Sequence, residues 1–107
     1  KSFDEALLEF RETLQIQPSH PQAQNNIGFI FWNLEAYEKA EIEFKKALTI
    51  NSKLPEIHYN LAAIYLKKSH NANAVFHLKQ VLKLQPKNTT AKKLLDYALG
   101  QVRQGSS

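Results

Sequence analysis

Apolar side chains recur along this chain every three or four residues, the spacing that places them on one face of an α-helix. The first run covers residues 3–17 and stops before Pro18, because a proline disfavours helical backbone at the residue that precedes it. Pro21 and Pro55 each open a new run, as expected of a residue that fits the first turn of a helix. The pattern predicts six helices: residues 3–17, Pro21 to Leu34, Tyr37 to about Asn51, two between Pro55 and Pro86, and residues 89–103.

The apolar pattern repeats itself along the chain at a constant offset. Matching residues include Pro21 and Pro55, Asn26 and Asn60, Phe31 and Tyr65, and the series Ala6, Ala40 and Ala74. A period of roughly 34 residues, with small and large apolar side chains at fixed positions, is typical of helix-turn-helix arrays. Units of this kind bury their apolar faces against their neighbours, so we expect a modest elongated core and no large catalytic cavity.

Two kinds of helix alternate within the repeat. The first kind carries apolar, small and aromatic positions, and the second carries alternating aromatic and small ones: Ile27-Gly28 with Phe31, Leu61-Ala62 with Tyr65, and Tyr37, Ala40, Phe44 and Ala47. In these positions the chain resembles tetratricopeptide repeats over almost its whole length. It departs from the family's pattern at Gln24 and His58, where tryptophan is frequent, and at Asp96, where a small residue is usual.

The resemblance implies an all-α fold of about six helices, with antiparallel helix-turn-helix repeats stacked in a right-handed α-solenoid. It implies one array over residues 1–107: the second helix of a partial repeat (1–20), two repeats (21–54 and 55–88), and a terminal helix with a tail (89–107). We expect the small residues Gly28, Ala40, Ala62 and Ala74 to let paired helices approach closely. The rings of Phe31, Phe44 and Tyr65 are then expected to fill the space between successive turns.

The side of the first-type helices that the core does not need carries amides, aromatic rings and lysines. The resemblance implies that this side lines a concave groove that holds an extended or helical peptide of a partner protein. Exposed aromatic rings are typical binding anchors, and an amide can grip a peptide backbone through both its donor and its acceptor. The predicted groove residues are Asn25, Asn26, Phe29, Trp32, Asn33, Tyr59, Asn60, Ala63, Lys67, Lys93 and Tyr97.

Two further interpretations limit this prediction. Trp32 and Tyr59 also fit a purely structural role in packing one helix against another.

Family members that capture the acidic C-termini of heat-shock chaperones use a clamp of lysine, asparagine, asparagine, lysine and arginine. The matching positions here are Asn25, Phe29, Asn60, Thr90 and Leu94, so only Asn60 agrees and capture of that kind is not expected.

Charge is distributed unevenly along the chain. The net charge is +4, but residues 1–44 hold eight acids against three bases and residues 45–107 hold eleven bases against two acids. A basic half favours an acidic protein partner. We do not expect a nucleic-acid partner, because arginine is scarce and no nucleic-acid-binding motif is present.

The residues that would support catalysis or cofactor binding are missing from the pattern. The sequence has no cysteine, no glycine-rich phosphate loop, and four histidines without a zinc-binding spacing. We therefore expect no enzyme activity, no cofactor and no metal, and we assign His20, His58, His70 and His77 to loops or packing. No apolar run reaches the roughly 18 residues that span a bilayer, so no membrane insertion and a cytoplasmic location are expected.

The sequence predicts a protein-interaction module that acts as a scaffold or adaptor. One alternative is a structural scaffold that assembles head to tail, because its two ends are halves of one repeat and its acidic front and basic rear attract each other. The other alternative is a regulatory or targeting segment of a larger enzyme.

Overall fold

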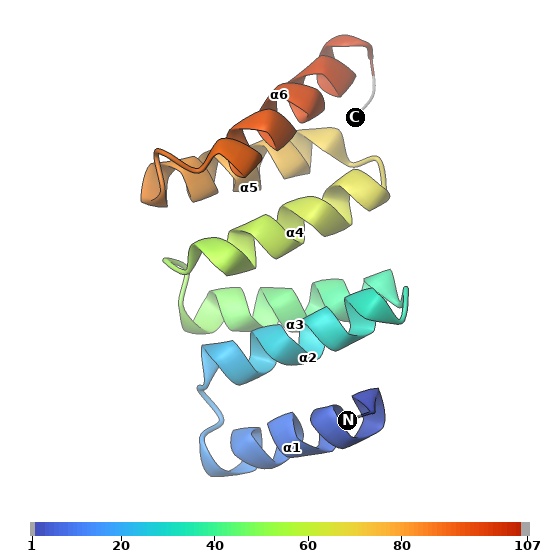
Figure 1. The fold of residues 1–107 in the computed structure, drawn as a ribbon, viewed down its shortest axis with the longest axis vertical. Helices are drawn as coiled ribbons and strands as arrows, with labels where there is room; N and C mark the ends of the chain where they lie inside the picture. Colours follow the sequence, from blue (N-terminus) through green and yellow to red (C-terminus); the bar gives the residue numbers. More distant parts are fainter. Residues whose placement is uncertain (1, 106–107) are drawn as a thin grey trace. The chain divides into compact units, whose positions relative to one another are not determined.

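The computed structural model describes residues 2–105, which form six α-helices. They are α1 (Phe3–Ile16), α2 (Pro21–Asn33), α3 (Tyr37–Ile50), α4 (Pro55–Lys67), α5 (Asn71–Leu84) and α6 (Thr89–Arg103), as Figure 1 shows. No strand occurs among the described residues. The prediction of an all-α fold with about six helices is confirmed, while the predicted tail at Ser106 and Ser107 lies outside the described residues.

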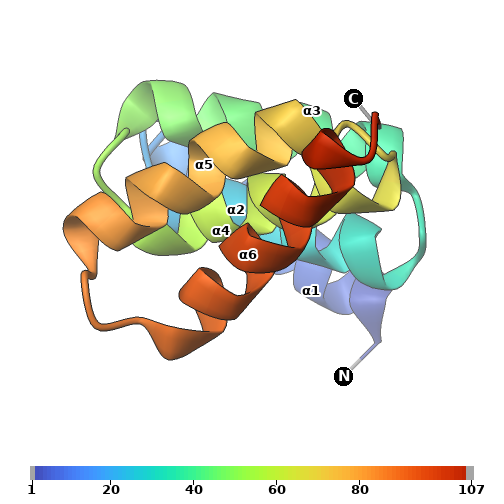
Figure 2. The same cartoon turned by 90° about the horizontal axis from the view of Figure 1, so that it is seen from above.

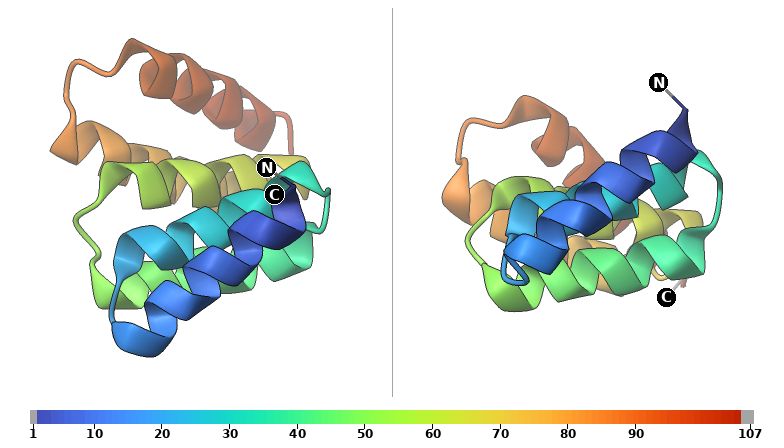
Figure 3. Two further views of the ribbon diagram at one scale, coloured as in Figure 1. Left: turned by 60° about the horizontal axis from the view of Figure 1, so that its bottom comes forward. Right: turned by 90° about the horizontal axis from the view of Figure 1, so that it is seen from below.

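The chain divides into two compact units, residues 1–52 and residues 53–107. In unit 1, α2 and α3 form an antiparallel hairpin, and α1 packs against α2 (Figure 3). In unit 2, α4 and α5 form the equivalent hairpin, and α6 packs on α5 (Figure 2). Each unit therefore consists of one helical hairpin and one additional helix.

Both hairpins turn through the same backbone geometry. Glu35 and Ser69, which occupy the same position in successive repeats, adopt left-handed φ values of 58° and 59°. In the second turn the amide of His70 donates to the carbonyl of Tyr65 at 2.8 Å and the amide of Ser69 donates to the carbonyl of Leu66 at 3.2 Å. These two bonds make a Schellman motif, which satisfies the last carbonyls of α4. The turn therefore ends the helix without the glycine that usually occupies this position.

Small residues allow the helices of each hairpin to approach closely, as predicted. A Cβ atom on Gly28 would lie 2.5 Å from Cε1 of Phe44, so the phenyl ring occupies the space that a side chain would need. Ala40, Ala62 and Ala74 are completely buried. The close packing of α2 on α3 thus depends on the absence of a side chain at one position.

Two large apolar side chains of unit 1, Leu34 and Phe31, are not fully buried. Leu34 is exposed because α2 ends at Asn33, so Leu34 no longer lies on a continuous helix face. Phe31 is only half-buried, and the ammonium group of Lys39 lies 5.8 Å from the centre of its ring. Ile30 is buried instead, three residues after Ile27 and therefore on an overlapping face of the helix.

The core of unit 2 consists mainly of aliphatic side chains. Its fully buried large side chains are Ile57, Leu61, Ile64, Leu78 and Val81. The last helix contributes through Ala91 and Ala98, which are fully buried, while Leu95 and Leu99 are half-buried. Asp96, in register with Gly28 and Ala62, is exposed and carries its carboxylate to solvent.

Candidate functional site

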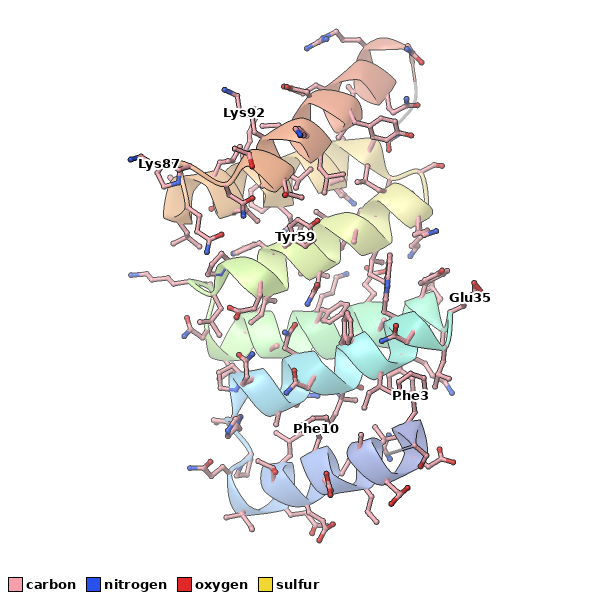
Figure 4. The ribbon with its side chains drawn as sticks, in the orientation of Figure 1. Phe3, Phe10, Glu35, Tyr59, Lys87 and Lys92 are labelled. Atoms are coloured by element: carbon pink, nitrogen blue, oxygen red, sulfur yellow. The ribbon has the colours of Figure 1, made fainter. Side chains whose placement is uncertain are left out.

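A pocket of about 230 Å³ lies in unit 2 between α4 and the turn that leads into α6. It is lined by Pro55, Glu56, Tyr59, Asn60, Val81, Gln85 and Asn88. Tyr59 and Asn60 come from the side of α4 that the sequence analysis assigned to ligand binding, and Figure 4 shows Tyr59 above α4 in the direction of α6. Pro55 places these residues early in the helix, because it forms the first helical position.

The opposite wall of the pocket is fixed by the cap of α6. The side-chain oxygen of Asn88 accepts the amide of Ala91 at 2.9 Å, which satisfies one of the unpaired amides at the helix start. Nδ2 of Asn88 donates to Oε1 of Gln85 at 2.9 Å. The two amide side chains are therefore held in place before any ligand arrives.

The pocket combines an aromatic ring, an apolar floor and several amides. Tyr59 and Asn60 are half-buried, Val81 is buried, and Glu56 is exposed at the rim. Small-molecule sites usually enclose roughly 300–1,000 Å³, so this pocket suits one side chain or a short backbone segment rather than a metabolite. Its chemistry suits a peptide, because amides pair with backbone groups and the ring packs on an apolar side chain.

Four of the predicted residues in unit 1 are accessible to different degrees. Phe29 and Asn33 are exposed, but Nδ2 of Asn33 already donates to the carbonyl of Phe29 at 3.0 Å. Asn26 is half-buried. Trp32 is half-buried and packs edge-on against Tyr37 with ring centroids 5.2 Å apart, the packing role considered as an alternative.

Asn25 is buried in this structure. Only 5% of its surface is exposed, so its amide is not available to a ligand without a rearrangement of its surroundings. The helical projection alone placed Asn25 on the outer side of α2, but it could not show which neighbouring groups cover that side.

The remaining predicted residues of unit 2 lie outside the pocket. Ala63 is half-buried, and Lys67, Lys93 and Tyr97 are exposed. The structure thus brings together only Tyr59 and Asn60 from the predicted set. Sequence reasoning missed Val81, Gln85 and Asn88 as pocket residues, although Asn88 before the last apolar run is a recognisable helix-start signal.

The histidines form contacts that the sequence analysis did not predict. Nδ1 of His20 accepts the amide of Ala23 at 2.9 Å and caps α2. Nδ1 of His58 and Nδ1 of His77 lie 3.0 Å apart, within hydrogen-bonding distance. His70 stacks on the ring of Tyr65 with centroids 6.3 Å apart. The assignment to loops and packing misses the hydrogen bond between His58 and His77, which are 19 residues apart in sequence.

Neither a metal site nor a membrane span is evident in the part of the chain that the structure describes. No three histidine, cysteine or acidic side chains gather there in a way that could hold a metal ion. Within residues 2–105, no helix has the length and apolar character needed to cross a bilayer.

The bases and acids are arranged differently in the two units. In unit 1, Lys45 pairs with Glu41 at 2.8 Å and Lys46 pairs with Glu43 at 3.7 Å. Residues 53–107 contain nine lysines and arginines but only Glu56 and Asp96 as acids. Figure 4 shows Lys87 and Lys92 pointing away from the helices of unit 2. Unit 2 therefore has an excess of basic over acidic side chains.

The family model of the tetratricopeptide repeat protein 21 C-terminal ARM domain matches residues 1–98. The chain belongs to this family. The predicted resemblance to tetratricopeptide repeats is thereby confirmed, and it agrees with the helical hairpins and with the shared geometry of their turns. A comparison with curated proteins finds no significant match.

Solved tetratricopeptide repeat structures have the same fold. The first repeat domain of Spaghetti (RPAP3), bound to the HSP90 peptide SRMEEVD, superposes with a TM-score of 0.88 at 20% identity, over 94% of this chain and 80% of that one. A MamA RS-1 double mutant superposes with a TM-score of 0.89 at 25% identity, over 96% of this chain and 58% of that one. The Arabidopsis OM64 domain superposes with a TM-score of 0.85 at 19% identity, over 92% of this chain and 82% of that one.

Proposed function

We propose that this chain is a protein-interaction module, without catalysis of its own, that binds a peptide or helix of a partner protein along its first-type helices. The observation that carries this proposal is the pocket at Tyr59 and Asn60, because it lies on the side of α4 that the repeat pattern leaves outside the core. Its amides and its ring match the needs of a polypeptide ligand. The module acts as a scaffold or adaptor.

The ligand differs in chemistry from the HSP90 tail held by the RPAP3 domain. That peptide, SRMEEVD, carries three acidic side chains and a terminal carboxylate. At the clamp positions of such domains this chain has Asn25, Phe29, Asn60, Thr90 and Leu94. None of these side chains is cationic, so a carboxylate at the clamp positions would find no matching charge there.

A peptide selection tests the proposal directly. The full chain is used to select binders from a displayed library of random peptides, and each synthetic peptide is then measured by calorimetry. Asn60→Ala is expected to weaken binding by about 1–3 kcal/mol, because it leaves buried backbone groups of the peptide unpaired. Tyr59→Ala is expected to weaken binding as well through the loss of ring contact.

The matched control is Asn73→Ala, the same substitution at an exposed position on α5 outside the pocket. It should leave the dissociation constant unchanged, and circular dichroism should show that all three variants remain folded. Peptides that bind the Asn60→Ala and Tyr59→Ala variants as tightly as they bind the unsubstituted protein would exclude the pocket as the binding site. A selection that yields no binder at all would contradict the proposed function.

Self-assembly is a second candidate function, favoured by apolar side chains exposed on two helices of opposite charge. Phe3 and Leu8 are exposed on α1, which also carries four acids and a single arginine. Tyr97 and Val102 are exposed on α6, whose bases outnumber its one acid. Contact between α1 of one copy and α6 of another would be heterologous and would form rings or filaments. Self-assembly would be rejected if light scattering at low salt shows a monomer at all protein concentrations.

A further inference from the structure

The two helical hairpins each have a polar side-chain contact at the same repeat position. In unit 1, Nε2 of Gln24 donates to Oε1 of Glu43 and links α2 to α3. In unit 2, His58 and His77 occupy the equivalent positions of the next repeat and link α4 to α5. Gln24 is 8% exposed and His58 is 5% exposed, so both contacts are largely removed from water. The repeat therefore provides a site for one polar pair, and the two units fill it with different chemistry.

The two imidazole rings are held in a fixed orientation. Their centroids are 5.3 Å apart while the two Nδ1 atoms are 3.0 Å apart, so the rings meet end to end rather than face to face. His77 stacks on Tyr65 at 5.6 Å with an interplanar angle of 12°, and Phe76 contacts its edge at 5.0 Å. These aromatic neighbours limit how far the rings can turn away from each other.

A hydrogen bond between two Nδ1 atoms requires one N–H donor and one bare nitrogen. A protonated imidazole carries hydrogen on both nitrogens and accepts no hydrogen bond. If both rings are protonated, two donors and two positive charges face each other at the distance of the present contact. The folded hairpin therefore accommodates one added proton, whereas the two histidines of an unfolded chain take up two.

Other titratable and charged groups lie on the helices of unit 2 around the His58–His77 pair. Tyr65 contacts His77 directly, and His70 contacts Tyr65. The remaining charged side chains of unit 2 from α4 to α6 are Glu56, Lys67, Lys68, Lys79, Lys83, Lys87, Lys92, Lys93, Asp96 and Arg103. Bases outnumber acids eight to two in this set, so the net charge of these helices disfavours a second proton on the pair.

We propose that the His58–His77 pair makes unit 2 acid-sensitive: uptake of a second proton breaks the contact and loosens α4 from α5. The sign follows from proton counting. The unfolded state binds one proton more than the folded state in acid, so stability falls as the pH falls. Tyr59 and Asn60 follow His58 directly on α4, and Val81 belongs to α5. Loosening of the hairpin would therefore also disturb the pocket.

The test replaces the histidine pair of unit 2 with the glutamine–glutamate pair of unit 1, and we call this variant the exchanged protein. His58→Gln with His77→Glu gives unit 2 the pair that unit 1 already uses. Both the parent and the exchanged protein carry His20→Asn, which keeps an N-cap acceptor on α2 without an imidazole. Urea unfolding of the full chain is followed by circular dichroism between about pH 7.5 and about pH 5, above the range in which most carboxylates titrate.

In the parent, the folding equilibrium constant is expected to fall by up to about tenfold for each pH unit below about pH 6. In the exchanged protein this dependence should be clearly weaker, because its α4–α5 pair contains no imidazole. Equal pH dependence in the two proteins would overturn the proposal.

Nitrogen-15 NMR of the unsubstituted chain gives an independent readout that does not require the exchanged protein to fold. A scalar coupling across the Nδ1–H···Nδ1 bond is expected at about pH 7.5, and it should vanish only when the pair takes up its second proton in acid. Absence of the coupling at about pH 7.5 would overturn the proposal. Neither measurement uses a peptide ligand, so the outcome is separate from the proposed function.

Discussion

At the scale of single residues, two glycines in helices have opposite roles. Gly28 lies against the ring of Phe44, where a Cβ atom would come within 2.5 Å of the ring. Gly100 lies in α6, and a Cβ atom there would meet nothing within 4 Å. The same residue type therefore serves close packing at one position and only weakens the helix at the other.

Alanine at these two positions should change stability in opposite directions. Gly28→Ala is expected to lower the free energy of unfolding by about 1–3 kcal/mol, because the phenyl ring must move out of its packed position. Gly100→Ala is expected to raise it by up to about 1 kcal/mol through better helix propensity. Urea unfolding followed by circular dichroism measures both. Unchanged stability of Gly28→Ala would mean that Phe44 has room to shift.

Periodicity made the helices predictable, but burial of individual residues was less so. The helices follow from the spacing of apolar residues and from the prolines, which act locally. Gly28 could be assigned from its repeat position, whereas Asn25 and Phe31 could not, because their burial depends on which groups of other helices cover them. Most of the pocket could not be predicted either: of its seven lining residues only Tyr59 and Asn60 were in the predicted set, and Gln85 and Asn88 join them only through the fold of the turn before α6.

At the scale of secondary-structure elements, the two hairpin turns are similarly strained. Glu35 and Ser69 adopt left-handed backbone conformations that cost residues with a Cβ atom about 1–2 kcal/mol. Glycine adopts this conformation without that cost. Neither turn has glycine, so each hairpin is less stable than its geometry allows.

Glycine in these turns should stabilise the protein. Glu35→Gly and Ser69→Gly are each expected to raise the free energy of unfolding by about 0.5–1 kcal/mol, after subtraction of the extra entropy of glycine in the unfolded chain. Thermal unfolding provides the measurement. Lys79→Gly, on the exposed side of α5, is the control and should lower stability by about 1 kcal/mol. A loss of stability in both turn variants would contradict the argument from strain.

At the scale of the whole molecule, charge separates the two units. The lysines of unit 1 include two that pair with glutamates on the same helix, whereas unit 2 has nine bases and two acids. Because long-range attraction depends on uncompensated charge, unit 2 should attract an acidic partner during encounter.

Poly-L-glutamate is a suitable probe of this attraction. Its affinity for the full chain is expected to fall by about tenfold as the salt concentration rises well above physiological, because exposed charges are screened. Lys87→Gln with Lys92→Gln should weaken binding at low salt more than Lys45→Gln with Lys46→Gln, which removes the same charge from paired lysines. Fluorescence anisotropy measures both effects. Salt-independent binding, or equal loss in the two double variants, would exclude steering by unit 2.

The repeat also places a large apolar side chain at the same exposed position of every second-type helix. Leu8, Ile42 and Phe76 are 62%, 54% and 56% exposed, and they occupy the same position in successive repeats. Three equivalent adhesive spots give each molecule a valency of three for weak contacts, and weak contacts add up when they are multivalent. The solubility of the protein is thus linked to its number of repeats. Each added repeat of this kind would contribute another exposed apolar side chain and lower the highest concentration at which the protein stays in solution.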